Sequence, residues 1–445
     1  MDADSINAAC RHTSAADVAA RTNHYAAVAF TLSCVAIAVG CGGNTAVPTP
    51  DASTSDAAAT LDSGTPDAAD PTCGGGRCAI RVVGGRFERD GRPWIPNGAV
   101  ITGFVAPQPL LKGAYAKARM AWGQPLLTAL RAMGANTIRF NVSMAAIDPT
   151  NFLGGAIDAA GKAAYLEEIK TAVALVEANG MNVIMTMQTG DVAGDPDAEP
   201  RPGEQTARAW RVLAPVFGDD PAVILNAFNE PGFGGAATID EDQSPWQVWR
   251  TGFTLLVDSI RATGATNVIM LDGISTSRVW RKNTDANVPV DPLNQLAYDI
   301  HPFPTDPTQR SNDGNGAPKL SYTTTADIDY WLDGWCDTHA CAATAFFSGI
   351  SLNADAGNCY DGKPPGPAVT SPDIVRAFAN HFQAKHIGIM LFAGDWAYRV
   401  FDDPAAPAAL TTFVGFTDCL GNKRMGPASA MKALWTTGTV PLPVP

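Results

Sequence analysis

The chain has 445 residues, of which 46% are hydrophobic and 17% charged, and its formal net charge is −13. This apolar fraction is large enough for a sizeable core, which excludes a chain that is disordered throughout. The acidic charge disfavours nucleic acid as a partner, because its phosphates would be repelled. Only eight of the 44 acidic residues are glutamates, and the last is Glu241. Residues 242–445 must therefore use aspartate wherever they need a carboxylate.

An apolar run of fifteen residues, Ala26–Gly40, lies near the start of the chain. It is too short to span a bilayer and suits the core of a secretory signal. The run ends in Ala-Val-Gly-Cys at Cys41, which resembles the lipobox of bacterial lipoproteins, where the cysteine is lipidated and becomes the mature N-terminus. An ordinary signal peptide with an incidental cysteine is the alternative. We expect residues 1–41 to be a signal or lipoprotein leader.

Residues 42–72 consist mainly of Ala, Thr, Ser, Pro, Gly and Asp, with no Lys or Arg. Such a segment cannot bury enough apolar surface to order itself and is typical of a linker. A linker behind a lipidated cysteine would tether a domain of residues 73–445 to a membrane surface through the lipid anchor only. The expected location is the outer membrane or cell surface, or otherwise the periplasm or the medium.

Six cysteines follow the leader, and an even number in an exported chain favours disulfides. We expect a local bridge between Cys73 and Cys78, with the other four linking the C-terminal part in an open pairing. Zinc is the alternative, although the chain has no CxxC pair and a single histidine near these cysteines, His339. The four C-terminal cysteines are Cys336, Cys341, Cys359 and Cys419.

From residue 73 onward, short apolar runs alternate with helical patterns. A hairpin is expected at Arg81–Trp94, where Gly84-Gly85 and Asp90-Gly91 supply the turns. Most of the later runs are continuously apolar, as in parallel strands that are buried on both faces. With Ile95–Val105 as the first, the runs predict strands at Thr137–Val142, Asn182–Met187, Ala222–Phe228, Asn267–Leu271, Leu296–Ile300, Ala345–Leu352 and Ile387–Phe392.

Helical patterns separate these strands, at Gln124–Met133, Ala163–Ala178, Gln205–Leu213, Trp246–Ala262 and Pro372–Lys385. About eight β–α repeats over this length predict an α/β fold, a single (β/α)8 TIM barrel preceded by a short hairpin. A doubly wound open sheet is the alternative, but neither GxGxxG nor GxxxxGK follows a strand. Active sites of TIM barrels lie at the C-terminal ends of the strands, so the residues at those ends carry the functional prediction.

The strand ends resemble those of glycoside hydrolase family 5, the cellulase and mannanase family. The resemblance covers roughly residues 80 to 436 and rests on GANTIRFNV, NAFNEPG, YDIHPF and a tryptophan after the eighth strand. It implies that Glu230 is the general acid/base that protonates the departing glycosidic oxygen. It also implies substrate-binding roles for Asn229 at the sugar 2-OH, Arg139 beside the nucleophile, His301 along the subsite and Trp396 as a stacking platform.

One expected residue is missing. The family's nucleophile is a glutamate that ends the seventh strand, and Gly349 falls where it should stand. Three accounts remain open. An aspartate substitutes for it, with Asp395 or Asp272 as candidates for the second carboxylate; the protein has lost hydrolysis and only binds glycans; or a different site is used.

We therefore predict a glycoside hydrolase that cleaves O-glycosidic bonds in a polysaccharide such as a β-glucan or mannan. A catalytically impaired, glycan-binding surface lipoprotein is the alternative. The expected partner is a poly- or oligosaccharide, without a cofactor or metal ion, and the chain is expected to be a monomer.

Overall fold

The computed structural model describes residues 79–190, 193–195, 198–302, 324–345, 372–392, 416–417, 423–424 and 427–438. The predicted leader, the linker and Cys41 lie outside these ranges. So do Asp395, Trp396 and the position of the missing nucleophile. Among the described residues, no helix is both long and apolar enough to cross a membrane.

The described part of the chain begins with the predicted hairpin, which is confirmed and has a third strand. It comprises β1 (Ile80–Val83), β2 (Arg86–Arg89) and β3 (Arg92–Pro93), paired antiparallel in that order. Gly84 and Gly85 both have positive φ, 56° and 74°, as a two-residue turn between twisted strands requires. The buried side chains of Ile80 and Phe87 project from one face of this sheet.

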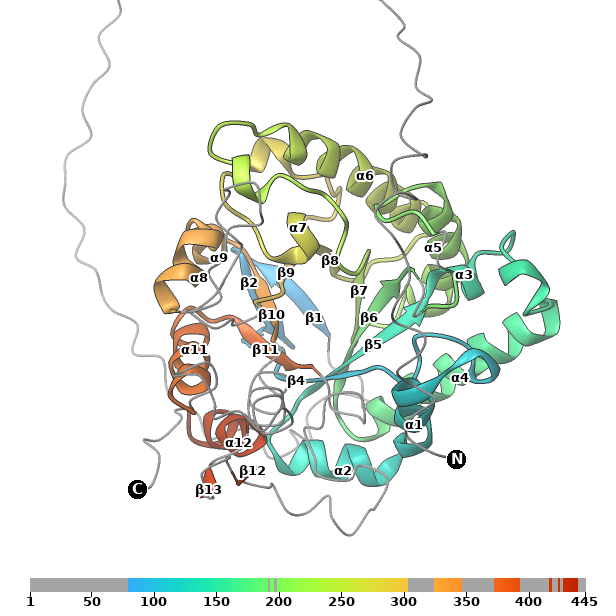
Figure 1. Ribbon diagram of the computed structural model, residues 1–445, viewed down its shortest axis with the longest axis horizontal. Helices are drawn as coiled ribbons and strands as arrows, with labels where there is room; N and C mark the ends of the chain where they lie inside the picture. The colour runs from blue at the N-terminus through green and yellow to red at the C-terminus, as the bar shows by residue number, and fades with distance from the viewer. Residues whose placement is uncertain are drawn as a thin grey trace, which may run out of the picture. The chain divides into compact units, whose positions relative to one another are not determined.

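Eight parallel strands close into a barrel, so the predicted (β/α)8 TIM fold is confirmed (Figure 1). Each strand pairs with its neighbours in chain order, and the last pairs with the first through Met390 and Gly98. The strands are β4 (Gly98–Ile101), β5 (Thr137–Ser143), β6 (Asn182–Gln188), β7 (Val223–Asn226), β8 (Ile269–Asp272), β9 (Leu296–Ile300), β10 (Cys341–Ala345) and β11 (Gly388–Leu391).

Helices surround the barrel on its outside, as Figure 1 shows. The longest of the described helices, α4, starts where the Asp158 side chain accepts a hydrogen bond from the Gly161 N–H at 2.7 Å, a standard N-cap. The α-helices are α1 (Gly113–Ala121), α2 (Gln124–Ala132), α3 (Met144–Ile147), α4 (Ala159–Ala178), α5 (Glu204–Phe217), α6 (Ser244–Arg261), α7 (Ile274–Ser277), α8 (Thr325–Leu332), α9 (Trp335–Thr338), α11 (Pro372–Ala384) and α12 (Pro427–Thr437).

Short elements complete the described chain. Four 3-10 turns lie in the loops, and a two-stranded antiparallel sheet lies near the C-terminus. They are η3 (Gln108–Leu110), η4 (Leu153–Gly155), η6 (Ala236–Thr238), η7 (Asp285–Asn287), β12 (Phe416–Thr417) and β13 (Lys423–Arg424).

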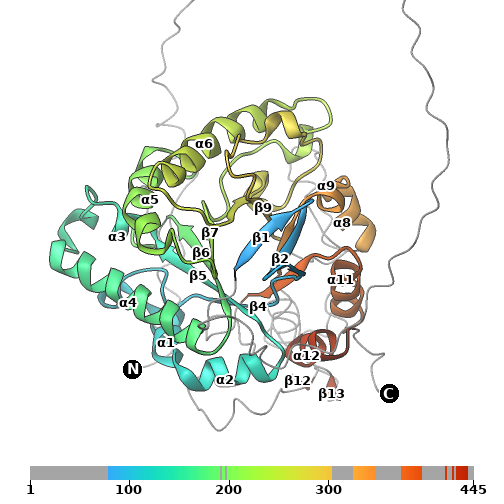
Figure 2. The ribbon, with the colours of Figure 1, turned by 180° about the vertical axis from the view of Figure 1, so that it is seen from behind.

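The barrel has two apolar cores. The larger fills the space between the strands and the surrounding helices. The smaller lies inside the barrel, where Ile80 and Phe87 of the hairpin pack against Val100, Ile184 and Met270 of the strands. Seen from behind, the hairpin lies across this end of the barrel (Figure 2). The hairpin therefore closes the bottom of the barrel and leaves the opposite end for polar residues.

Strand β10 (Cys341–Ala345) begins four residues before the strand predicted at Ala345–Leu352. Its small residues give a weak local strand signal, and parallel pairing with β9 and β11 determines its position. Residues 346–352 lie outside the described ranges. Cys341 at the start of β10 forms a disulfide with Cys336, which confirms a bridge in the C-terminal part. The other predicted cysteine partners are not in the described residues.

Candidate active site

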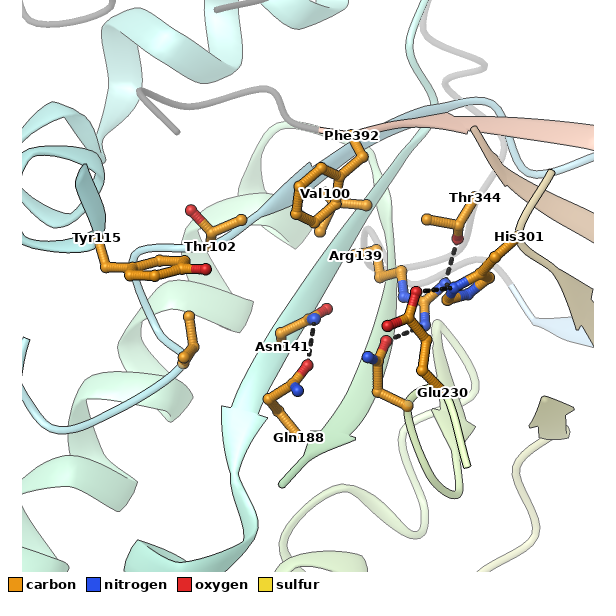
Figure 3. Close-up of a pocket in the computed structure, with 12 residues that line it drawn as sticks. Val100, Thr102, Tyr115, Arg139, Asn141, Gln188, Glu230, His301, Thr344 and Phe392 are labelled. Carbon is orange, nitrogen blue, oxygen red and sulfur yellow. Dashed lines mark hydrogen bonds and ion pairs between the residues drawn. The ribbon is translucent and has the colours of Figure 1, made fainter. Parts of the chain in front are cut away.

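A pocket opens at the C-terminal ends of the barrel strands (Figure 3). Polar groups from β5, from β10 and from the segments after β7 and β9 form one side of it, and Tyr115 of α1 stands on the other. Of the described residues that line the pocket, Glu230 is the only one with a carboxylic acid. The lining residues are Val100, Thr102, Val105, Tyr115, Arg139, Asn141, Gln188, Asn229, Glu230, His301, Thr344 and Phe392.

Glu230 lies in the loop after β7 and has a backbone φ of 53°. Residues other than glycine are uncommon in this left-handed region and, where they occur, often mark functional sites. Asp272, at the end of β8, holds the strained backbone by accepting a hydrogen bond from the Glu230 N–H at 2.8 Å. The side chain is 31% exposed, so its carboxyl group can meet a ligand.

Arg139 is buried in the floor of the pocket, with 1% of its surface exposed. Its guanidinium forms an ion pair with Asp299 of β9 and donates to the Thr344 hydroxyl of β10. It also donates to Thr186 Oγ1 at 2.9 Å and to Asn229 Oδ1 at 3.1 Å. A buried guanidinium needs this many partners, because an unpaired charge in the interior is costly.

His301 follows β9 and lies between carboxylates. Its Nδ1 is 2.8 Å from Glu230 Oε1, and its Nε2 is 3.1 Å from Asp299 Oδ2. Nε2 also lies 3.5 Å from Asp272 Oδ2. Neutral imidazole has a single N–H, whereas the imidazolium has two and can donate to carboxylates on both sides. The carboxylate contacts thus favour the charged ring, although the Arg139 guanidinium, 3.2 Å from Nε2, opposes it.

The electrostatics of this network agree with that assignment. Burial alone would lower the pKa of His301, but Asp299 and Asp272 raise it to about 10. Burial would raise the pKa of Asp299, yet Arg139 and His301 bring it below its ordinary value. For Asp272, burial dominates and raises the pKa to about 6, with Asp299 adding to the effect and His301 opposing it.

The same cluster is the part of the described chain that most resembles a metal centre. Asp272, Asp299 and His301 offer three ligand-type atoms within 4.8 Å of one another. However, the Arg139 guanidinium already lies against Asp299, and a divalent cation would have to displace this fixed positive charge. The donor set therefore fits an ion-pair network and not a metal site.

Four predicted site residues come together here: Arg139, Asn229, Glu230 and His301. Asp272 lies beneath them, with no exposed surface, and accepts a hydrogen bond from Asn226 Nδ2 at 2.8 Å besides that from Glu230. Asp395 and Trp396 fall outside the described residues, so their roles remain predictions.

Several residues of the site were not anticipated from the sequence. Asp299 was missed, although it lies in β9 two positions before the predicted His301, and the two-residue period of extended chain in the YDIHPF motif would place both side chains on the same side. Thr344 was missed because β10 was placed too late in the chain. Tyr115 and Phe392 come from a helix and from the position after β11, and no motif marked either of them.

Comparison with known proteins identifies the family. The sequence profile of the cellulase family, glycosyl hydrolase family 5, matches residues 110–406. The chain therefore belongs to glycosyl hydrolase family 5 and is a glycoside hydrolase. This membership gives no support to the alternative of a sugar-binding protein without hydrolytic activity.

Individual relatives are more distant. The manganese dependent endoglucanase Eg5A of Phanerodontia chrysosporium is 29% identical over 181 residues, which cover 38% of this chain and 43% of that protein. The chain thus matches less than half the length of this curated relative.

Two solved structures share the fold. The β-glucanase SdGluc5_26A of Saccharophagus degradans has a TM-score of 0.51 at 20% identity, over 74% of this chain and 88% of the other. The catalytic domain of endoglucanase Cel5A from Thermobifida fusca has a TM-score of 0.51 at 14% identity, over 80% and 97%.

Proposed function

We propose that this protein hydrolyses O-glycosidic bonds in a β-glucan or a mannan, with Glu230 as the general acid/base. The observation that carries the proposal is the half-open position of the Glu230 carboxyl group on the pocket wall, held from behind by His301 at 2.8 Å. The names of the relatives favour β-glucan as the first substrate to test.

The contacts of Glu230 suggest different roles for its two carboxyl oxygens. Oε1 accepts from the His301 ring, so Oε2 is the oxygen that can carry the acid proton. Protonation of the leaving oxygen by Oε2 breaks the glycosidic bond through an oxocarbenium-like transition state. Asn229, held by Arg139, lies next to Glu230 and is placed to bind a sugar hydroxyl at the same time.

A second carboxyl group is needed to attack the anomeric carbon or to activate water. The distance from the first is about 5–5.5 Å in retaining enzymes and about 6.5–9.5 Å in inverting ones. Because Asp272 is completely buried and supports the Glu230 backbone, we propose Asp395, four residues after the end of β11 in the sequence, for this role. Asp395→Asn should then abolish turnover while oligosaccharide binding persists. If the Asp395→Asn variant retains full activity, this assignment is wrong.

The central test is Glu230→Gln, assayed on β-glucan and on mannan. Loss of a general acid should lower kcat by about 10²–10⁴-fold. Glu241→Gln is the matched control, because it makes the same chemical change at an exposed position of the same long loop. Equal rates for wild type and Glu230→Gln would refute the acid/base role, and oligosaccharide binding without turnover in the wild type would favour a lectin-like protein.

We also propose that the barrel is an exported monomer, anchored at the outer membrane or cell surface through a lipid on Cys41. The apolar run before Cys41 and the polar linker after it support this location. Expression of the full chain and of Cys41→Ser, followed by membrane fractionation and mass spectrometry, tests it. Recovery of both proteins in the soluble fraction, with no lipid on Cys41, would contradict the anchor.

A further inference from the structure

Asp299 is a buried carboxylate for which the proposed acid/base mechanism has no direct use. It is 1% exposed and does not line the pocket. Nevertheless, three groups of the site converge on it, because Arg139, His301 and Thr344 all contact its Oδ2 atom. The family resemblance implies a carboxylate at the end of the seventh strand beside the arginine. In the described part of β10, the side chain that contacts Arg139 is the Thr344 hydroxyl.

We propose that Asp299 is the positioning residue of this active site and replaces the seventh-strand carboxylate as the counterion of Arg139. This inference rests on the proposed role of Glu230. Asp299 touches no reacting atom and acts through two neighbours. Asp299 holds Arg139, which orients Asn229 through a hydrogen bond. It also holds His301, which orients Glu230 in the same way.

Two short series of contacts start at the Asp299 carboxylate. In the first, Asp299 Oδ2 is 3.1 Å from His301 Nε2, and His301 Nδ1 is 2.8 Å from Glu230 Oε1. In the second, Asp299 pairs with Arg139, which donates to Asn229 Oδ1 at 3.1 Å. Asp299 thus fixes both the acid and the adjacent sugar-binding amide.

The charge of Asp299 also determines what His301 can donate. The ring faces Glu230 from the β7 loop, Asp272 from β8, Asp299 from β9 and the Arg139 guanidinium from β5. Two N–H groups are required to serve Glu230 and Asp299 together. If the Asp299 charge is removed, one stabilising carboxylate is lost and Arg139 still repels the ring, so the imidazolium becomes less favourable.

The test is Asp299→Asn, which keeps the shape of the side chain and removes its charge. The matched control is Asp291→Asn, because the side chains of Asp291 and Asp299 are each 1% exposed and Asp291 is paired through both oxygens with Arg261, away from the pocket. Both variants are compared with wild type in urea denaturation and in kcat and KM on β-glucan from pH 5 to 10. Histidine NMR signals, with His301→Gln for assignment, report the protonation of His301.

We expect both variants to lose stability, but only Asp299→Asn to change catalysis. Its kcat should fall by up to about a hundredfold, as expected for a misplaced catalytic group. The alkaline limb of its kcat–pH profile and the midpoint of the His301 titration should both move to lower pH, by about 1–3 pH units. The KM should change less than kcat, because Asp299 does not line the pocket.

Two results would overturn the inference: an unchanged pH profile and His301 titration in Asp299→Asn, or the same kinetic loss in Asp291→Asn. Either finding would leave Asp299 as a structural ion-pair partner. Failure of the proposed function is distinguishable, because then Glu230→Gln itself would keep wild-type activity. The NMR titration reads the Asp299–His301 coupling independently of any substrate.

Discussion

Arg139→Met separates the structural part of the buried network from its catalytic part. Methionine keeps the apolar stem of the side chain and removes the guanidinium. Asp299 then loses its guanidinium partner and keeps only the His301 ring, at 3.1 Å, as a cationic neighbour, and the oxygens of Thr186, Asn229 and Thr344 lose a donor. Breaking one side of a buried ion pair costs about 3–5 kcal/mol when the remaining charge is uncompensated. Because the His301 ring still compensates part of the Asp299 charge, we expect a loss near the lower end of this range.

The loss of unfolding free energy in Arg139→Met is large because the ion pair is buried. An arginine in a more exposed ion pair, Arg281, provides the comparison. Arg139 and Asp299 are each 1% exposed, whereas Arg281 is 17% exposed and its partners Asp240 and Asp333 are 44% and 38% exposed. For such a surface pair, Arg281→Met should cost only about 0–1 kcal/mol. The two variants remove the same chemical group, so their difference measures the effect of burial.

Urea denaturation of the purified full chain, followed by tryptophan fluorescence, provides the free energies of unfolding. The double variant Arg139→Met with Asp299→Asn should be more stable than the sum of the single losses predicts, by about 0.5–3 kcal/mol. The reasoning is refuted if Arg139→Met costs less than about 1 kcal/mol, or if the two losses simply add.

Three further predictions concern pH, substrate binding and redox state. The raised pKa of His301, about 10, provides stability that is complete below about pH 6.5 and is lost as the pH rises toward 10. At about 1.36 kcal/mol per pH unit, the loss of unfolding free energy reaches at most about 5 kcal/mol. If denaturation curves of His301→Gln showed the same alkaline loss of stability as the wild type, this assignment to His301 would be contradicted. Tyr115→Ala should raise KM on oligosaccharides up to about tenfold by removing aromatic contact area, and an unchanged KM would exclude Tyr115 from binding. Reduction of the Cys336–Cys341 disulfide should cost about 2 kcal/mol, since it closes a short loop; an unchanged melting temperature after reduction would show that the bridge contributes nothing.

The strands illustrate how far local patterns determine the fold. Thr137–Val142 and Asn182–Met187 were predicted within one residue of β5 and β6, because short runs rich in β-branched and large apolar residues are typical of buried parallel strands. Strand β10 was misplaced, since its sequence CAATA lacks large β-branched or aromatic residues. Its position depends on hydrogen bonds to β9 and β11, which no local pattern encodes.

In the active site, too, some residues could be predicted from the sequence while their contacts could not. Arg139, Glu230 and His301 could be predicted from the sequence, because each stands at or near a strand end and the barrel topology brings these ends together. The partnership of Arg139 with Asp299, 160 residues further along the chain, depends on two strands facing each other across the barrel.

The amino-acid sequence alone determined the alternation of strands and helices, the family motifs and the absence of glutamate after Glu241. Only the tertiary structure decided which carboxylate balances Arg139. That choice depends on distances inside a closed barrel, where a buried charge must find its counterion among whatever side chains the neighbouring strands present.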